Sequence, residues 1–98
     1  MRAVRFHPAA RTELLAATRF YRAEAAGLGR ALASEVRSAL ERISVFPESG
    51  SPDGEDLRKV FLDRFPFTLV YRVRGDEIEV LAVMHQRQRP GYWRTRVE

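Results

Sequence analysis

The amino-acid sequence predicts a small α+β domain in which a pair of helices packs on one face of a largely antiparallel sheet. Three observations support this fold class. Two consecutive segments have apolar residues at helical spacing, two later segments rich in β-branched and aromatic residues flank a Gly-Asp pair, and 98 residues suffice for one domain with a modest core. We therefore expect residues 1–98 to form a single domain with the element order β-α-α-β-β-β and a short C-terminal tail.

The first strand and the first helix are expected at the N-terminus. Residues 3–6 alternate small or apolar side chains with basic ones, as a short strand does, and Pro8 suits the first position of a helix, where its missing N–H costs nothing. Apolar residues then recur at helical spacing to about residue 26. We expect Gly27 and Gly29 to end this helix.

A second helix is predicted over residues 28–46, and Pro47 ends it. Because the connection to the first helix is short, the two helices should form an antiparallel hairpin. The segment 47–56 is rich in turn-forming residues and is expected to be a polar loop. The helical spacing of the second helix rests on Leu32, Val36, Leu40 and Ile43.

The Gly75-Asp76 pair predicts a tight turn between two strands, because glycine readily takes the positive φ that such a turn requires. With these residues in the turn the register is fixed, and a slip of one residue would exchange the two faces. Residues 78–84 are apolar on both sides, so this strand should lie inside the sheet, with residues 57–62 beyond its hairpin partner. The expected pairs are Arg74 with Glu77, Arg72 with Glu79, Tyr71 with Val80, Val70 with Leu81, and Phe67 with Met84.

In this register one face of the hairpin is apolar throughout and should receive the two helices. The opposite face is mixed and carries both Arg72 and His85. Trp93 is expected to fold back and pack on this mixed face, whereas for Tyr92 packing and recognition stay equally open. The residues expected to face the helices are Phe67, Leu69, Tyr71, Val73, Ile78, Val80, Ala82 and Met84.

Composition limits the classes of function. The net charge of +4 and the sequence pI of about 10.3 favour polyanionic partners such as nucleic acid or an acidic protein. The chain has no cysteine, which removes disulfides and cysteine-based zinc sites and fits a reducing cytoplasm. No apolar run is long enough for a signal peptide or a membrane span. Without a Gly-rich phosphate loop, a catalytic triad or a metal-ligand cluster, we expect neither a cofactor nor a metal.

A series of motifs follows one another along the chain: FHPAA at 6–10, RFPF at 64–67, VYR at 70–72, IEVLAV at 78–83 and HQRQRP at 85–90. In order and spacing they resemble the RelE/ParE superfamily of small bacterial toxins from type II toxin–antitoxin modules. Within that superfamily the chain looks more like the ParE and plasmid-stabilisation branch.

This resemblance implies a toxin that is held inactive by a cognate antitoxin encoded beside it. In the family the antitoxin tail lies over the toxin's helix hairpin or along its sheet edge. A disordered acidic or amphipathic segment that folds on binding would suit a basic surface of this kind. The antitoxin contacts expected on the exposed side of the hairpin are Arg19, Arg22, Arg30 and Arg37.

The resemblance leaves the toxic activity open between two classes, and enzyme status with it. In the ParE-like branch the toxin binds DNA gyrase and traps its cleaved DNA complex, so it is an inhibitor and not an enzyme. We favour this activity, although some members of the branch have no toxicity. Aromatic and arginine side chains carry most interface energy, so the target-binding residues would be Arg87, Arg89, Tyr92 and Trp93.

The alternative is the RelE-like activity, in which the toxin sits on the ribosome and cleaves mRNA without a metal by activating the ribose 2′-OH. That chemistry needs a base, an acid and cations around the phosphate. His85 would be the acid–base group because histidine titrates near neutral pH. A structural interpretation competes for each group: His85 can cap the end of its strand, and Arg72 can pair with Glu79. The other candidate catalytic residues are Arg58, Lys59, Arg72 and Tyr92.

Overall fold

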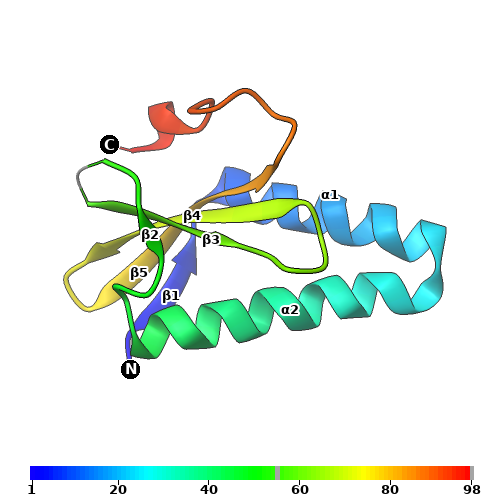
Figure 1. Ribbon diagram of the computed structural model, residues 1–98, viewed down its shortest axis with the longest axis horizontal. Helices are drawn as coiled ribbons and strands as arrows, with labels where there is room; N and C mark the ends of the chain where they lie inside the picture. The colour runs from blue at the N-terminus through cyan, green and yellow to red at the C-terminus, as the bar shows by residue number, and fades with distance from the viewer. Residues whose placement is uncertain (55, 98) are drawn as a thin grey trace.

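The structure of the protein, a computed structural model, describes residues 1–54 and 56–97. In this part of the chain two helices lie against a mixed sheet (Figure 1), which confirms the predicted fold class and order of elements. A two-residue strand that the sequence did not predict precedes the second predicted strand. The elements are β1 (Ala3–Phe6), α1 (Pro8–Glu24), α2 (Ala26–Val45), β2 (Ser51–Pro52), β3 (Leu57–Phe61), β4 (Phe67–Arg74), β5 (Glu77–His85) and a short 3₁₀ helix, η1 (Arg94–Arg96).

The strand order in the sheet is β1-β5-β4-β3-β2. β1 runs parallel to β5, and the other neighbours are antiparallel. β5 therefore lies inside the sheet and β3 lies on the far side of β4, both as predicted. β1 ends at Phe6 and pairs with β5 only as far as Val80. Among the described residues, the second half of β5 consequently has a strand neighbour on one side only.

The two helices run side by side in opposite directions (Figure 1), as predicted. α1 begins at Pro8. The predicted stop at Gly27 and Gly29 is wrong, because the chain leaves helical geometry already at Ala25 (φ −163°, ψ 138°) and both glycines lie inside α2. Gly29 instead allows the helices to approach closely, since a Cβ there would lie 3.0 Å from that of Arg22. Neither described helix combines the length and the apolar character that crossing a membrane requires.

The β4–β5 hairpin keeps the predicted register only near its turn. Arg72 pairs with Glu79 as predicted, but Val70 pairs with Ala82 and not with Leu81. Leu81 is therefore the extra residue of a β-bulge, which locally breaks the pairing and bends the strand.

The bulge exchanges the two faces of β5 beyond it. Val83 packs on the helix side, whereas Ala82 and Met84 pack on the opposite side, which reverses the prediction for all three. Phe67 pairs with His85 and not, as predicted, with Met84. A single extra residue thus decides which side chains of the last strand meet the helices.

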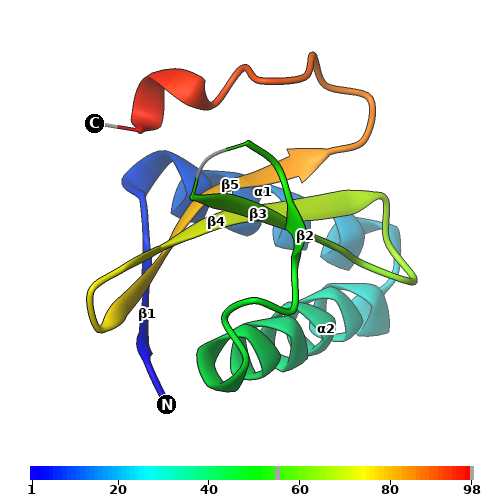
Figure 2. The same cartoon turned by 60° about the vertical axis from the view of Figure 1, so that its left-hand side comes forward.

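Each face of the sheet is covered by a different segment (Figure 2): the helices lie on one side and the chain after β5 lies on the other. On the helix side, α1 contributes Ala10 and Ala17, and α2 contributes larger apolar residues such as Leu32, Val36 and Ile43. On the opposite side, the buried cluster consists of Leu57, Val70, Leu81, Ala82, Met84 and Trp93.

Candidate functional site

Residues 86–97, here called the strap, follow β5 and cross the sheet on the side opposite the helices (Figures 1 and 2). The strap begins with a turn in which the N–H of Gln88 donates to the carbonyl of His85 at 3.0 Å. Residues 86–90, here called the outer loop, are exposed, whereas Trp93 is buried. The strap therefore combines an exposed loop with an internal anchor.

Trp93 is the apolar anchor of the strap. Its side chain is 0% exposed and packs with Val70, Leu81 and Met84. Its predicted packing on this face is confirmed. A fully buried ring has no surface left for a second macromolecule in this conformation, which argues against the predicted contact of Trp93 with a target.

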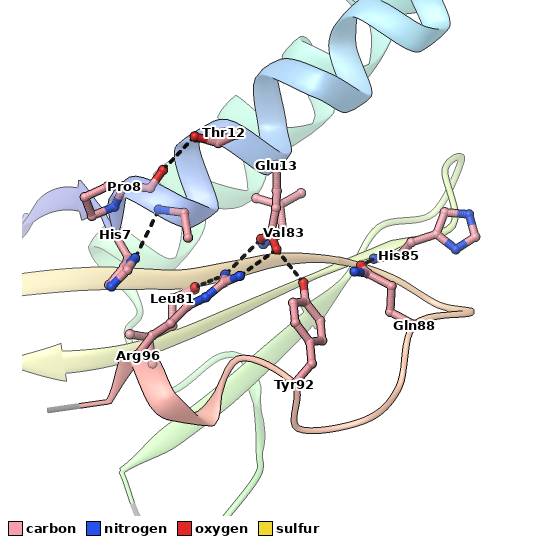
Figure 3. A network of polar contacts seen from close by, with 11 residues as sticks. His7, Pro8, Thr12, Glu13, Leu81, Val83, His85, Gln88, Tyr92 and Arg96 are labelled. Atoms are coloured by element: carbon pink, nitrogen blue, oxygen red, sulfur yellow. Dashed lines mark hydrogen bonds and ion pairs between the residues drawn. The ribbon is translucent and has the colours of Figure 1, made fainter.

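Glu13, on α1, is the polar anchor of the strap (Figure 3). Its carboxylate accepts hydrogen bonds from the Tyr92 hydroxyl at 2.7 Å and from the Arg96 guanidinium at 3.1 and 2.9 Å. It also accepts the backbone N–H of Val83 at 2.9 Å. One side chain thereby joins a helix, an inner strand and the strap.

This contact lies where β5 loses its strand neighbour. Beyond Val80, β1 no longer pairs with β5, so the N–H of Val83 and the carbonyl of Leu81 need other partners. Glu13 accepts the first group, and Arg96 donates to the second at 2.8 Å. Glu13 of α1 and Arg96 of the strap thus provide hydrogen-bond partners for two backbone groups of β5 that β1 does not reach.

The contact with Glu13 shifts the pKa values of Tyr92 and Arg96. Burial raises the pKa of the Tyr92 phenol well above its ordinary value, and its hydrogen bond to Glu13 and the charge of that carboxylate raise it further. The hydrogen bond to Glu13 also raises the pKa of Arg96. Tyr92 therefore stays a neutral donor at neutral pH, which opposes its predicted role in proton transfer.

A weaker ionic contact holds the strap at a second point. Asp53, in the β2–β3 connection, lies 3.5 Å from Lys59 Nζ and 4.0 Å from Arg94 Nη2. The Arg94 guanidinium also lies 4.9 Å from the centre of the Trp93 ring. Lys59, predicted as a catalytic cation, is thus paired with Asp53 at the edge of the strap.

Sequence reasoning missed Glu13 and Asp53 as site residues. A signal for Glu13 exists: it lies three residues after Ala10 and four before Ala17, which are the buried residues of α1. A carboxylate beside the buried stripe of a helix needs a partner, because burying an unpaired charge is costly. Asp53 lies in a polar loop, where its sequence neighbours give no such signal.

His85 and Arg72 do not meet. His85 is opposite Phe67, five residues from Arg72 along β4, which corresponds to about 16 Å at roughly 3.3 Å per residue. Their predicted location on one face is wrong, because the bulge lies between them. His85 caps the turn that follows it, with Nδ1 accepting the N–H of Arg87 at 3.0 Å, and its ring lies edge-on to Phe67 with the ring centroids 5.2 Å apart.

The remaining catalytic candidates have structural partners. Arg72 is paired with Glu79 at 2.9 Å, and its side chain is only 13% exposed. Arg58 donates to the backbone carbonyls of Glu48 and Gly50 at 3.1 and 2.8 Å, and so fastens the loop after α2 to β3. Neither guanidinium is directed to His85 or to Tyr92.

The arginines predicted to contact an antitoxin are all exposed. Arg19 and Arg22 lie three residues apart on α1, and Arg30 and Arg37 lie seven apart on α2, so each pair shares a face of its helix. Within residues 1–54 and 56–97, none of the four lies within 4.0 Å of a carboxylate oxygen. The helix hairpin therefore presents four exposed arginines that make no ion pair with the described residues.

A hollow of about 730 Å³ lies at the β4–β5 turn and not at the strap. Its charged residues are mutually compensated, since Arg5 pairs with Glu77 at 3.1 Å and Glu79 pairs with Arg72. As far as the structure describes the chain, no three His, Asp or Glu side chains come together as a metal site.

Comparison with known proteins agrees with this fold. The family model described as "ParE toxin of type II toxin-antitoxin system, parDE" matches residues 4–90. The chain belongs to the ParE toxin family. The predicted membership of the RelE/ParE superfamily, and of its ParE branch, is thereby confirmed. A comparison with curated proteins gave no match.

A solved structure resembles this ParE-family chain over most of its length. It is described as the "Chromosomal ParDE TA system from P. aeruginosa", and the match has a TM-score of 0.63 with 22% sequence identity. It covers 87% of this chain and 96% of that one, and at this identity it shows a shared fold. The family match ends at residue 90, so Tyr92, Trp93 and Arg96 of the strap lie beyond it.

Proposed function

We propose that this ParE-family toxin inhibits DNA gyrase by binding to it and is not an enzyme. The contact surface is the outer loop, residues 86–90, in which Arg87 and Arg89 are exposed and carry two positive charges. Tyr92 adds a half-buried aromatic ring at the base of this loop. Arginine and aromatic side chains are the residues that most often dominate an interface.

The observation that carries this proposal is the dispersal of the groups that mRNA cleavage would need. His85 and Arg72 lie at opposite ends of the hairpin, and Arg72 is occupied by Glu79. The raised pKa of Tyr92 disfavours proton transfer from its hydroxyl near neutral pH. General acid–base catalysis requires such groups within hydrogen-bond reach of one reacting site.

Membership of the family implies a cognate antitoxin, and we propose that it contacts the helix hairpin. The four exposed arginines, Arg19, Arg22, Arg30 and Arg37, attract an acidic segment. The double variant R19E/R22E should weaken co-purification with the antitoxin of the same module, while R5E/R74E, which reverses the same amount of charge at exposed positions on β1 and β4, should not. Equal loss in both variants would show that net charge, and not this surface, decides binding.

The decisive experiment adds purified protein to a gyrase supercoiling assay and, in parallel, to ribosomes programmed with mRNA. We expect inhibited supercoiling, accumulation of cleaved DNA complex and intact mRNA. Cleavage of mRNA that is lost in His85→Ala or Arg72→Ala would establish the nuclease activity instead. Neither effect, together with normal growth on expression, would leave a family member without toxicity.

A pair of matched variants tests the contact surface. R87A/R89A should raise the concentration for half-inhibition of gyrase by about tenfold or more, the usual effect of losing interface arginines. R11A/R42A removes the same charge from exposed positions on α1 and α2 and should leave inhibition unchanged. Equal effects of the two variants would contradict a specific role of the outer loop.

A further inference from the structure

We propose that Glu13 is a positioning residue for gyrase inhibition: it holds the strap so that the outer loop is presented to the target in one orientation. The proposal rests on the function proposed above and adds to it a residue on α1. Glu13 itself belongs to the partly buried contact beneath the strap, so it acts through Tyr92 and Arg96 and touches no target.

The first argument is the way in which the outer loop is fixed. At its start, the N–H of Gln86 donates to the carbonyl of Pro66 at 2.9 Å, and the N–H of His85 donates to the Gln88 side chain at 2.8 Å. At its end, the chain returns to the sheet at Tyr92, whose hydroxyl donates to Glu13. A loop held at both ends has a defined shape, and release of one end would free it.

The second argument is that the apolar anchor cannot supply this orientation by itself. The Trp93 ring is fully buried, but its indole Nε1 has no hydrogen-bond partner among the described residues, and neither has the buried hydroxyl of Thr68. Apolar burial is non-directional. The directed hydrogen bonds of the strap to the body of the domain at this point are those of Tyr92 and Arg96 to Glu13 and of Arg96 to Leu81.

The third argument is the reach of Glu13 along the sequence. Its partners in the strap, Tyr92 and Arg96, lie 79 and 83 positions after it in the sequence. Glu13 also holds β5 through the backbone N–H of Val83. The carboxylate thus ties the strap to the same strand from which the outer loop departs. A shift of this contact would move the base of the loop relative to β5.

The single tryptophan makes the position of the strap measurable. Trp93 is the one tryptophan of the chain, so fluorescence excited at a wavelength that the three tyrosines hardly absorb reports on the strap alone. The test compares E13Q, R96Q and R96K with wild type in three measurements: Trp93 emission, far-UV circular dichroism and half-inhibition of gyrase supercoiling. E35Q is the matched control, because Glu35 also accepts backbone N–H groups, but those of Asp63 and Arg64, far from the strap in sequence.

We expect E13Q and R96Q to weaken gyrase inhibition by about tenfold, the order expected when a charge-assisted hydrogen bond is lost. Their Trp93 emission should shift to longer wavelength while circular dichroism stays native. R96K, which keeps the charge, should recover part of the inhibition, and E35Q should behave as wild type.

Several results would overturn the proposal. Wild-type inhibition by E13Q and R96Q would show that the strap needs no positioning, and an equal loss in E35Q would show a general effect on stability. If wild type leaves gyrase untouched, the proposed function fails, and growth inhibition on expression replaces supercoiling as the readout for the same variants. A wild-type chain without either effect would overturn both proposals.

Discussion

The two faces of the sheet are closed in different ways. On the helix face, side chains at helical spacing from α1 and α2 form a continuous apolar cluster with the strands, including Leu32, Val36 and Leu69. On the strap face, one buried aromatic ring is assisted by the charged contacts of Glu13 and Asp53. The helix face therefore supplies stability through area, whereas the strap face depends on a few directed contacts for the position of an exposed loop.

This difference suits a small toxin that must keep its fold while it offers a surface to a partner. Loss of apolar packing should destabilise the whole domain, because both helices and the strands β1, β3, β4 and β5 contribute to the helix-side clusters. Loss of a polar contact under the strap should instead release one segment and leave the sheet and helices in place. Substitutions on the two faces can therefore be compared by how far their effects spread.

The largest effect is expected from Leu32→Ala on the helix face. Leu32 is fully buried on α2, so its truncation removes apolar contacts and leaves a cavity, at a cost of about 3 kcal/mol in the free energy of unfolding. Urea denaturation followed by circular dichroism measures this value. Leu15→Ala, at a position 47% exposed on α1, should change it by less than about 0.5 kcal/mol. A loss below about 1 kcal/mol in Leu32→Ala would contradict the central role of this face.

A smaller and more local effect is expected from Arg96→Ala on the strap face. The substitution removes the charged partner of Glu13 and a donor to the carbonyl of Leu81, with an expected cost of about 1.5 kcal/mol. Hydrogen exchange should accelerate in the strap and at Val83 while the amides of α2 keep their protection. Uniform acceleration throughout the domain would show that the strap is part of the global fold and not a separate unit.

The sequence predicted the helix face far better than the strap face, for a physical reason. Helical spacing and the Gly75-Asp76 turn are local signals. They correctly predicted the helix pair, the hairpin and the strand pairs nearest its turn. The bulge at Leu81 leaves no such signal: residues 80 to 84 are apolar on both sides, so either register buries them. The face of Val83 is then decided by contacts with distant elements.

The strap could be predicted only in part. The size of Trp93 and the mixed polarity of the sheet face sufficed to predict its packing, because a large apolar ring gains most by leaving water. The partner of Tyr92 could not be inferred in the same way, since Glu13 is 79 positions away and the pairing depends on where β1 ends. Directed contacts between remote segments follow from the fold and not from local pattern.

Alkaline pH should weaken the strap face through Tyr92. The phenol of an unfolded chain loses its proton near pH 10, whereas burial and then the contact with Glu13 raise the pKa of Tyr92 in the folded state. The contribution of Tyr92 to the free energy of unfolding is therefore complete below about pH 10. Above that pH it declines by at most about 1.4 kcal/mol per pH unit.

Denaturation of wild type and Tyr92→Phe at pH 8 and at about pH 11 measures this decline. The wild type should lose more stability than Tyr92→Phe between the two values, because phenylalanine has no proton to release. Tyr71 also has a pKa raised by burial, so part of the alkaline loss should persist in the variant. Identical losses in the two proteins would place the alkaline sensitivity entirely at Tyr71 and away from the strap.

The smallest effect is expected from Asp53→Asn, and it separates the two polar anchors of the strap. Asp53 lies 3.5 Å from Lys59 and 4.0 Å from Arg94, longer than the contacts of Glu13, and Arg94 is 60% exposed. An ion pair that is exposed on one side, such as that with Arg94, contributes about 0.5 kcal/mol and is screened by salt, and the less exposed pair with Lys59 is too long for a strong hydrogen bond. The difference between wild type and variant in urea denaturation should therefore shrink when salt is raised. A salt-independent loss above about 1.5 kcal/mol would rank Asp53 with Glu13, because only a desolvated and directed contact stabilises to that extent.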